Sequence, residues 1–131
     1  MKSKIILIAD DDQEDRDMLE EIILGIDSET VIHSLSNGHQ VQDFLKQCDD
    51  KLLPSIIVLD YNMPVITGAE LLVKIQAEEK FKPIPVVIMS TSNAQKHVDE
   101  CMANGANEYF VKPTDFRELK NLAQRILDMA N

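Results

Sequence analysis

Five short apolar segments alternate with segments of helical periodicity, and this alternation restricts the fold more than any other feature of the sequence. The apolar segments span residues 5–9, 30–35, 56–59, 85–89 and 108–111. Continuous apolar runs such as 56–59 are typical of strands that are covered on both faces. Because strands that alternate with helices form parallel sheets, the sequence predicts an open, doubly wound α/β domain with five strands and five helices.

The segments between the strands carry start signals for helices. A helix that begins near Gln13 has an apolar face made of Met18, Leu19, Ile22, Ile23 and Ile26. A second helix is expected over residues 38–48. Capping boxes predict later helix starts at Thr67 with Glu70, Ser92 with Gln95, and Thr114 or Asp115 with Glu118. The last helix is expected to pack through Phe116, Leu119, Ala123, Ile126 and Ala130.

Length and charge limit the number of domains and the kinds of partner. The 131 residues, 44% of them hydrophobic, suffice for one packed core and are too few for two ordinary domains. Acidic residues number 23 against 13 basic ones, which gives a net charge of −10. Such a surface repels phosphate backbones and anionic lipids, so we expect no direct nucleic-acid binding and no membrane binding.

The N-terminal segment and the cysteines indicate the compartment. An apolar run of only five residues precedes three aspartates, and it is too short for a signal peptide or a membrane-spanning helix. Cys48 and Cys101 have neither the spacing of a metal site nor the density of a disulfide framework, so we expect buried free thiols. The sequence therefore predicts a cytoplasmic protein without membrane insertion.

Polar residues gather where the predicted strands end. These residues are Asp10, Asp11, Asp60, Ser90, Thr91 and Lys112, and Pro113 follows the last of them. The carboxyl ends of parallel strands meet at one edge of a sheet, and ligands bind there at the point where the strand order reverses. We therefore expect these side chains to converge.

Three converging carboxylates predict a metal site. They repel one another at low effective dielectric, and a bound cation relieves that repulsion. Oxygen ligands favour a hard ion such as Mg²⁺. We expect Asp11 and Asp60 to bind it directly with the backbone carbonyl of Asn62, while Asp10 holds a coordinated water. Asp60 is then a candidate nucleophile toward phosphorus.

Lys112 and Ser90 fit the same chemistry, because an ammonium and a hydroxyl can spread the charge of a phosphoryl group over its equatorial oxygens. Each residue also has an ordinary interpretation. The run from Asp10 to Asp12 could only cap a helix, and Asp60 could only start a turn. Lys112 could be a solvated charge and Ser90 a satisfied hydroxyl. Their occurrence together at successive strand ends favours a site.

Four motifs, ILIADDD, VLDYNMPVITG, VVIMSTS and YFVKP, carry a family resemblance. They resemble the receiver domains of two-component response regulators, in that family's order, over nearly the whole chain. The spacing is 30 residues from Asp60 to Ser90 and 52 from Asp60 to Lys112. The resemblance implies a flavodoxin-like receiver fold, with residues 1–131 forming a single receiver domain and no output domain.

The resemblance also implies a phosphorylation site. Asp60 would be the phosphoacceptor, Asp10 and Asp11 the acidic pair that binds Mg²⁺ (or Mn²⁺), and Lys112 the lysine that pairs with phosphate. A histidine kinase or phosphotransfer protein would supply the phosphoryl group. The domain would catalyse its own phosphorylation and slow dephosphorylation without turning over a separate substrate.

A conformational switch is the further implication of the resemblance. Ser90 would move toward the phosphoryl group and Tyr109 would turn inward, which would alter the surface for a partner protein that the sequence does not name. Without the resemblance, Tyr109 reads as a half-buried strand residue with a solvated hydroxyl. Pro113 is expected to follow a cis peptide bond.

Some positions depart from the common pattern. Thr91 stands where the family usually has alanine or glycine, so phosphoryl access is expected to be narrower. Asn62 and Ser92 flank the path of the hydrolytic water and carry no base, which predicts slow autodephosphorylation. Met18 and Ile22 could dock a kinase helix bundle, although packing of both on the sheet is the more economical interpretation.

Other functions fit the sequence less well. A phosphorylation-independent binding module of receiver type would not need Asp60, Lys112 and the acidic pair. A metal phosphatase of the haloacid-dehalogenase type would carry its nucleophile on the first strand within an Asp-x-Asp pattern, whereas the lone strand-end aspartate here is on the third. A dinucleotide enzyme would need a glycine-rich turn, and no Gly-x-Gly-x-x-Gly is present.

Overall fold

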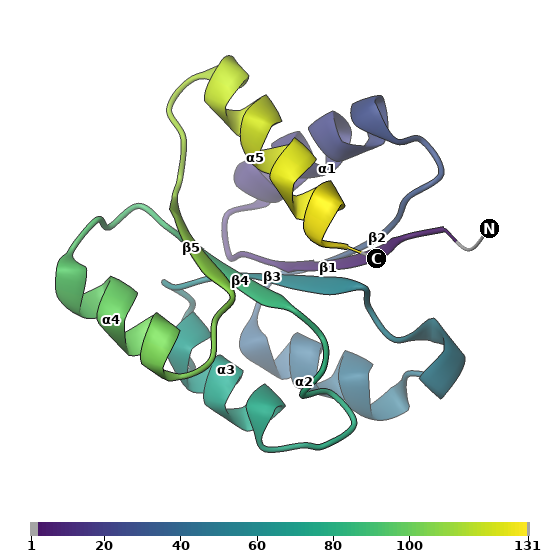
Figure 1. The fold of residues 1–131 in the computed structure, drawn as a ribbon, viewed down its shortest axis with the longest axis vertical. Coiled ribbons are helices and arrows are strands. Elements are labelled where there is room, and N and C mark those ends of the chain that lie inside the picture. The colour runs from purple at the N-terminus through teal and green to yellow at the C-terminus, as the bar shows by residue number, and fades with distance from the viewer. Residues whose placement is uncertain (1–2, 131) are drawn as a thin grey trace.

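The computed structural model describes residues 3–130 and contains one five-stranded sheet with helices on both faces (Figure 1). Neighbouring strands are all parallel, in the order β2-β1-β3-β4-β5. The strands are β1 (Ile5–Ala9), β2 (Val31–Leu35), β3 (Ile56–Asp60), β4 (Val86–Ser90) and β5 (Glu108–Val111). The predicted doubly wound, flavodoxin-like fold is confirmed. Met1, Lys2 and Asn131, at the ends of the predicted domain, lie outside the described residues.

The helices are divided between the two faces of the sheet. Figure 1 shows two of them on one face, α1 (Gln13–Ile26) and α5 (Phe116–Met129). The other face carries α2 (Gly38–Gln47), α3 (Gly68–Gln76) and α4 (Gln95–Ala103). A short 3₁₀ helix, η1 (Asp50–Leu52), precedes β3 and was not predicted. Within residues 3–130, no helix combines the length and hydrophobicity needed to cross a membrane.

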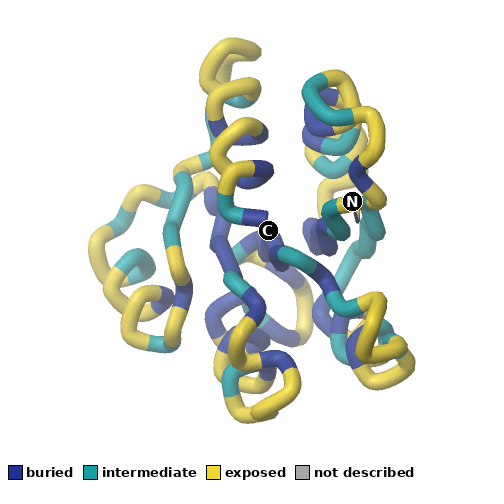
Figure 2. Tube along the Cα trace, turned by 45° about the vertical axis from the view of Figure 1, so that its right-hand side comes forward, coloured by how far each residue is buried: buried dark blue, intermediate teal, exposed yellow. Residues whose placement is uncertain are grey.

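The sheet separates the hydrophobic core into two clusters, whose backbone is dark blue in Figure 2. Alternate residues of one strand serve opposite clusters: Ile57 faces α2 to α4, while Ile56 and Val58 face α1 and α5. Every residue of β3 is buried, which explains its continuous apolar run. Because β3 is the central strand, its last residue, Asp60, is buried with it.

Most helix starts are capped as the sequence indicates. The predicted capping box of Thr67 and Glu70 is confirmed at α3, and Asp115 is the residue that caps α5. The prediction for α4 is wrong, because its N-cap is Ala94 and makes no side-chain cap. The hydroxyl of Ser92 instead accepts a hydrogen bond from the Ala94 N–H, at 3.1 Å.

Several predictions of burial are wrong. Phe116 is 67% exposed and Met18 is 52% exposed, although Ile22 is buried as expected. Phe116 is the first residue of α5, which projects past the edge of the sheet in Figure 1, so its side chain has no core to enter. Cys101 is buried and free, whereas Cys48 is free but only partly buried.

The Lys112–Pro113 peptide bond is trans, as are all peptide bonds of the described residues. The predicted cis bond is therefore wrong for this structure. The trans form is the lower-energy isomer of an X-Pro bond, and in this structure it is compatible with Lys112 reaching the acidic residues at the end of the sheet.

Candidate functional site

Asp10, Asp11 and Asp60 form an acidic cluster at the carboxyl edge of the sheet. Each offers a carboxylate oxygen, and these oxygens lie within 4.8 Å of one another. Asp10 and Asp60 are only 5% and 4% exposed, whereas Asp11 is exposed. The register explains the convergence: Ala9 pairs with Leu59, so the aspartates that follow them emerge side by side. The predicted juxtaposition of the three carboxylates is observed.

The backbone around the cluster is held by hydrogen bonds to Asp10. The Asp12 N–H donates to Asp10 Oδ1 at 2.9 Å, while Asp12 Oδ1 accepts from the Asp15 N–H at the start of α1. The sequence left helix capping and cluster formation as alternatives for these aspartates. In the structure Asp12 caps α1, while Asp10 and Asp11 belong to the cluster. Arg16 was missed by the sequence reasoning: its guanidinium donates to the Asp10 carbonyl at 2.6 Å and to Ser34 Oγ at 3.1 Å.

Lys112 reaches the cluster from the end of β5. Its Nζ lies 2.8 Å from Asp10 Oδ2, 2.9 Å from Asp15 Oδ2 and 3.6 Å from Asp60 Oδ2. The Lys112 side chain is only 13% exposed, so these contacts replace water as its ligands. Asp15 was not among the predicted site residues. A signal was available, since the first turn of a helix that follows a strand lies beside the site at the strand's end.

Charge and burial act together on Asp60. Burial, followed by the negative charge of Asp10, raises the pKa of Asp60 from 3.8 to about 7, although Lys112 acts in the opposite direction. Burial also disfavours the charged form of Lys112, but its hydrogen bonds with Asp10 and Asp15 outweigh this and raise the pKa of Lys112. The cluster therefore retains an excess of negative charge that one lysine does not balance.

The donor set is suited to a hard divalent cation. Three carboxylates supply oxygen ligands, and the exposed Asp11 leaves the cluster open to water on one side. The Asn62 N–H donates to Asp60 Oδ1 at 3.3 Å, which turns the chain after β3 over the cluster. A cation bound by these oxygens would remove the repulsion that raises the pKa of Asp60.

The residues predicted to lie beside the phosphoryl group differ in their surroundings. Ser90 is fully buried at the end of β4, and its Oγ accepts a hydrogen bond from the Ser92 N–H at 3.0 Å. Thr91 and Asn62 are exposed, and Thr91 lines a cavity of about 230 Å³ together with Lys112. Ser92 is partly buried and its hydroxyl is engaged with α4, so it does not lie free beside the site.

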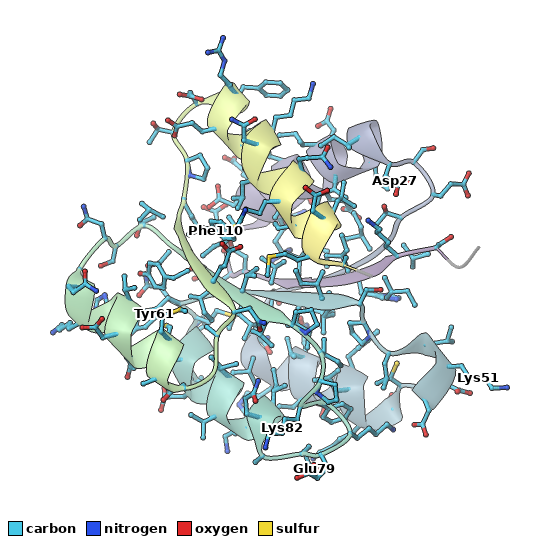
Figure 3. All side chains as sticks on the ribbon, in the orientation of Figure 1. Asp27, Lys51, Tyr61, Glu79, Lys82 and Phe110 are labelled. Atoms are coloured by element: carbon cyan, nitrogen blue, oxygen red, sulfur yellow. The ribbon has the colours of Figure 1, made fainter. Side chains whose placement is uncertain are left out.

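Tyr109 is directed inward, against the core cluster that α2 to α4 cover. Its hydroxyl donates to the Ser92 carbonyl at 2.7 Å, so the solvated hydroxyl expected from the residue alone is wrong. Tyr61 packs against the same cluster, whereas Phe110 packs on the opposite face of the sheet; both are labelled in Figure 3.

The loop after Asp60 contains two backbone constraints. Val65 has φ of +71°, and the Ile66 N–H donates to the Pro64 carbonyl at 2.8 Å, which describes a strained γ-turn. At Gly68 a Cβ atom would lie 2.5 Å from the Asp60 carbonyl oxygen. Only glycine allows the first turn of α3 to approach the end of β3 this closely.

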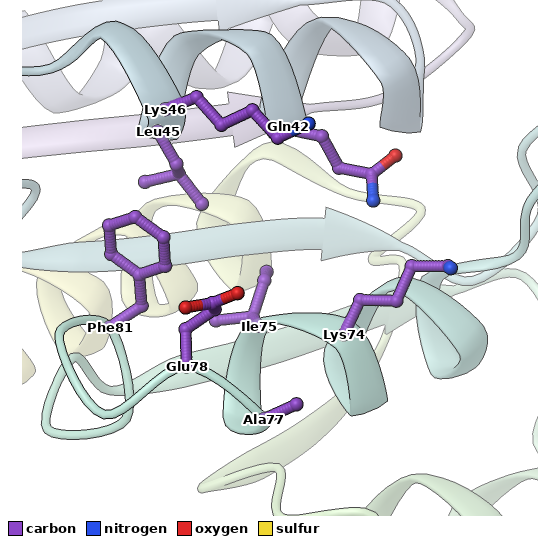
Figure 4. A pocket seen from close by; sticks show the side chains of 8 residues that line it. All are labelled: Gln42, Leu45, Lys46, Lys74, Ile75, Ala77, Glu78 and Phe81. Atoms are coloured by element: carbon purple, nitrogen blue, oxygen red, sulfur yellow. The ribbon is translucent and has the colours of Figure 1, made fainter.

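A larger cavity lies away from the cluster, between α2 and the end of α3 (Figure 4). Its volume is about 480 Å³, and Leu45, Ile75 and Phe81 form an apolar floor between Lys46 and Lys74. None of its lining residues belongs to the acidic cluster. Size alone therefore does not locate the chemistry of this protein.

Comparison with known proteins decides the family. Residues 6–124 match the sequence model of the response regulator receiver domain. The chain belongs to this family. It is 37% identical over 124 residues to two-component response regulator ARR3 of Arabidopsis thaliana, a match covering 89% of this chain and 53% of ARR3. With ORR5 of Oryza sativa subsp. japonica the identity is 31%, covering 93% of this chain and 87% of ORR5.

The first curated relatives are longer than this chain, which spans 53% of ARR3 and 62% of ARR15. Among solved structures, the Mn²⁺-bound response regulator Rcp1 is 28% identical with a TM-score of 0.82, covering 94% of this receiver domain and 91% of Rcp1. The phosphorylated cyanobacterial phytochrome response regulator RcpA has a TM-score of 0.87 at 24% identity, covering 98% and 94%, which supports the fold. Receiver domains bind a divalent metal at their acidic pocket, and the acidic cluster occupies that place here.

Proposed function

We propose that this receiver domain accepts a phosphoryl group on Asp60 from a histidine kinase or phosphotransfer protein, with Mg²⁺ (or Mn²⁺) bound at the acidic cluster. The observation that carries the proposal is the placement of the buried Asp60 carboxylate between two further aspartates and the Lys112 ammonium. Asp10, Asp11, Asp60 and the backbone carbonyl of Asn62 would hold the metal, with Asp10 acting through a water.

The residues divide the chemistry among them. A carboxylate oxygen of Asp60 attacks phosphorus in line, the P–N bond of phosphohistidine breaks, and its electron pair returns to the imidazole. The metal, when bound, screens the negative charge of the reactants and orients the phosphoryl oxygens. Lys112 is already 3.6 Å from Asp60 and is placed to pair with a phosphoryl oxygen, while the Ser90 hydroxyl donates to another.

A groove between α1 and α5 is the proposed docking surface for the phosphodonor. Met18 and Phe116 are exposed and line a cavity of about 350 Å³ between these helices. Met18 also lines the neighbouring cavity that contains Thr91 and Lys112, so the apolar groove leads to the phosphoryl site. An apolar helix of the donor lying along α1 would bring a phosphohistidine to Asp60.

The output of the domain is proposed to be a change of surface at α4, β5 and α5. Ser90 moving to the phosphoryl group would alter the turn that its Oγ now makes with the Ser92 N–H, and Tyr109 is bonded to the same residue. A downstream protein would read this change. The phosphodonor and the two free cysteines are in keeping with a cytoplasmic protein.

Intact-mass spectrometry after incubation with acetyl phosphate tests the proposal. We expect a single phosphoryl adduct on the wild-type protein in Mg²⁺, no adduct in EDTA, and none on Asp60→Asn. An adduct of equal yield on folded Asp60→Asn would exclude Asp60 as the acceptor. A folded wild-type protein inert to acetyl phosphate and to a phosphohistidine donor would favour the phosphorylation-independent binding module.

A further inference from the structure

Ser92 is the point at which the residues of the switch meet. All of its polar groups have partners: the N–H donates to Ser90 Oγ at 3.0 Å, and the carbonyl accepts from the Tyr109 hydroxyl at 2.7 Å. Its Oγ shares a hydrogen bond of 2.9 Å with His97 Nδ1. Ser90 and Tyr109 are thus linked to each other through one residue, which His97 holds from α4.

His97 is itself held by Tyr61, the residue that follows the end of β3. Its ring stacks on Tyr61, with centroids 4.6 Å apart and the planes inclined by 29°. Tyr61 directly follows Asp60, and its hydroxyl donates to Glu100 Oε1 on α4 at 2.6 Å. Tyr61 appears beside α4 in Figure 3. Both ends of the His97 side chain are therefore defined, one by the stack and one by the hydrogen bond.

Residues 92–94 belong to no helix or strand, so backbone pairing of a regular element does not fix Ser92. The Ala94 N–H also donates to Ser92 Oγ, which is a local turn that would persist without His97. That turn ties Ser92 to the backbone of Ala94, the N-cap of α4. The hydrogen bond with His97 is the contact that ties Ser92 Oγ to a side chain of α4.

We propose that His97 is a positioning residue of the phosphorylation switch: it fixes Ser92, and through Ser92 it couples the Ser90 hydroxyl to the position of Tyr109. The inference rests on the proposed function of Asp60 and Ser90. In this arrangement His97 touches neither the metal ligands nor the phosphoryl group. It acts by favouring the inward position of Tyr109, which depends on the Ser92 carbonyl as an acceptor.

The sequence offers a direct probe of this coupling. The protein has two tyrosines and no tryptophan, and both tyrosines belong to the network. Labelling with 3-fluorotyrosine gives two ¹⁹F resonances. The resonance that is missing from Tyr61→Phe belongs to Tyr61, and the other belongs to Tyr109. His97→Phe keeps a ring on Tyr61 but removes the hydrogen bond, whereas His97→Asn keeps a polar group near the Nδ1 position and removes the ring.

The matched control is His33→Phe. His33 is also partly buried and packs against an aromatic ring, that of Phe44, with centroids 4.6 Å apart and the planes tilted by 48°, but it lies on β2, at the opposite edge of the sheet from β5. A change caused by any histidine-to-phenylalanine replacement would appear in both variants. A change caused by the loss of the Ser92 contact would appear only in His97→Phe.

We expect His97→Phe to move the Tyr109 resonance, although His97 makes no hydrogen bond with Tyr109. The ratio of inward to outward Tyr109 should fall by about twofold to tenfold, the range for loss of one hydrogen bond. Ser92→Ala, which also removes the turn with Ala94, should lower the ratio at least as much, and His97→Phe should add nothing to it. His97→Asn should restore the wild-type signal, and His33→Phe should leave it unchanged.

The proposal is overturned if Tyr109 is unmoved in His97→Phe, if the effects of His97→Phe and Ser92→Ala are additive, or if His97→Asn is as altered as His97→Phe. This measurement uses unphosphorylated protein without a donor. Failure of the proposed function would appear separately, as the absence of an acetyl phosphate adduct on the wild-type protein. Where the adduct forms, its rate of formation should fall in His97→Phe by the same factor as the Tyr109 ratio.

Discussion

Replacing Asp60 by asparagine is expected to stabilise the metal-free protein at neutral pH. Burial and the charge of Asp10 raise the pKa of Asp60 from 3.8 to about 7 in the folded protein. At about 1.4 kcal/mol for each pKa unit, ionising this buried carboxyl costs the folded state about 4 kcal/mol. That figure is already net of the attraction to Lys112 at 3.6 Å, and the neutral amide removes it apart from what its own incomplete hydrogen bonding costs. We expect a net gain of about 2–4 kcal/mol in the free energy of unfolding.

The pH dependence follows from the sign of the shift. The folded-state pKa of Asp60 is raised, so stability from this group is fully present below its unfolded value of 3.8 and is lost as the pH rises toward about 7. The difference between Asp60→Asn and wild type should therefore be small near pH 4 and reach its maximum above pH 7.

Urea unfolding followed by circular dichroism, in EDTA and at a series of pH values, measures the difference directly. Asp11→Asn is the matched control, because Asp11 belongs to the same cluster but is exposed, and its gain should be smaller. Adding Mg²⁺ should stabilise the wild type more than Asp60→Asn. The reasoning is refuted if Asp60→Asn is no more stable than wild type at pH 7.5, or if its gain is the same at pH 4 and pH 8.

Three further substitutions test the surroundings of the site. Gly68→Ala should destabilise the protein by about 1–3 kcal/mol in urea unfolding, because its Cβ would press on the Asp60 carbonyl; unchanged stability would show that α3 can move away. Val65→Asn should stabilise it by about 1 kcal/mol, since the exposed Val65 has positive φ, and a loss would contradict this account. Thr91→Ala should speed adduct formation from acetyl phosphate by about twofold to tenfold, and equal single-turnover rates would remove the idea that Thr91 narrows access.

The three inner strands, β1, β3 and β4, were predictable from the sequence because their environment leaves little choice. A strand buried on both faces needs an apolar residue at every position, and the run before Asp60 satisfies this condition without interruption. The convergence of Asp10, Asp60 and Lys112 was predictable for a related reason, since parallel strands place all their carboxyl ends at one edge. The first inference uses the apolar run itself, and the second uses the common direction of the strands.

The partners of charged side chains, and the exposure of residues on the apolar faces of helices, could not be predicted in the same way. Asp15 pairs with Lys112, which lies far along the chain, and Arg16 donates to the carbonyl of Asp10 in the turn before α1. Helical periodicity does not reveal where a charged side chain will find a partner. Phe116 and Met18 obey the periodicity of a buried face but are exposed and line the groove between α1 and α5, because periodicity does not report whether a neighbouring element covers that face.

Two features that cost folding free energy lie together at the carboxyl end of the central strand. A buried carboxyl with a raised pKa and a valine with positive φ lie within six residues of each other, at Asp60 and Val65. Each lowers the stability of the metal-free protein, and neither is needed to form the sheet, whose strands pair through the backbone. A sequence under selection for folding alone would replace both, so their presence together indicates that this edge is retained for its chemistry. The same logic explains why an aspartate ending a buried strand was a better guide to function than the cavity of about 480 Å³ between α2 and α3.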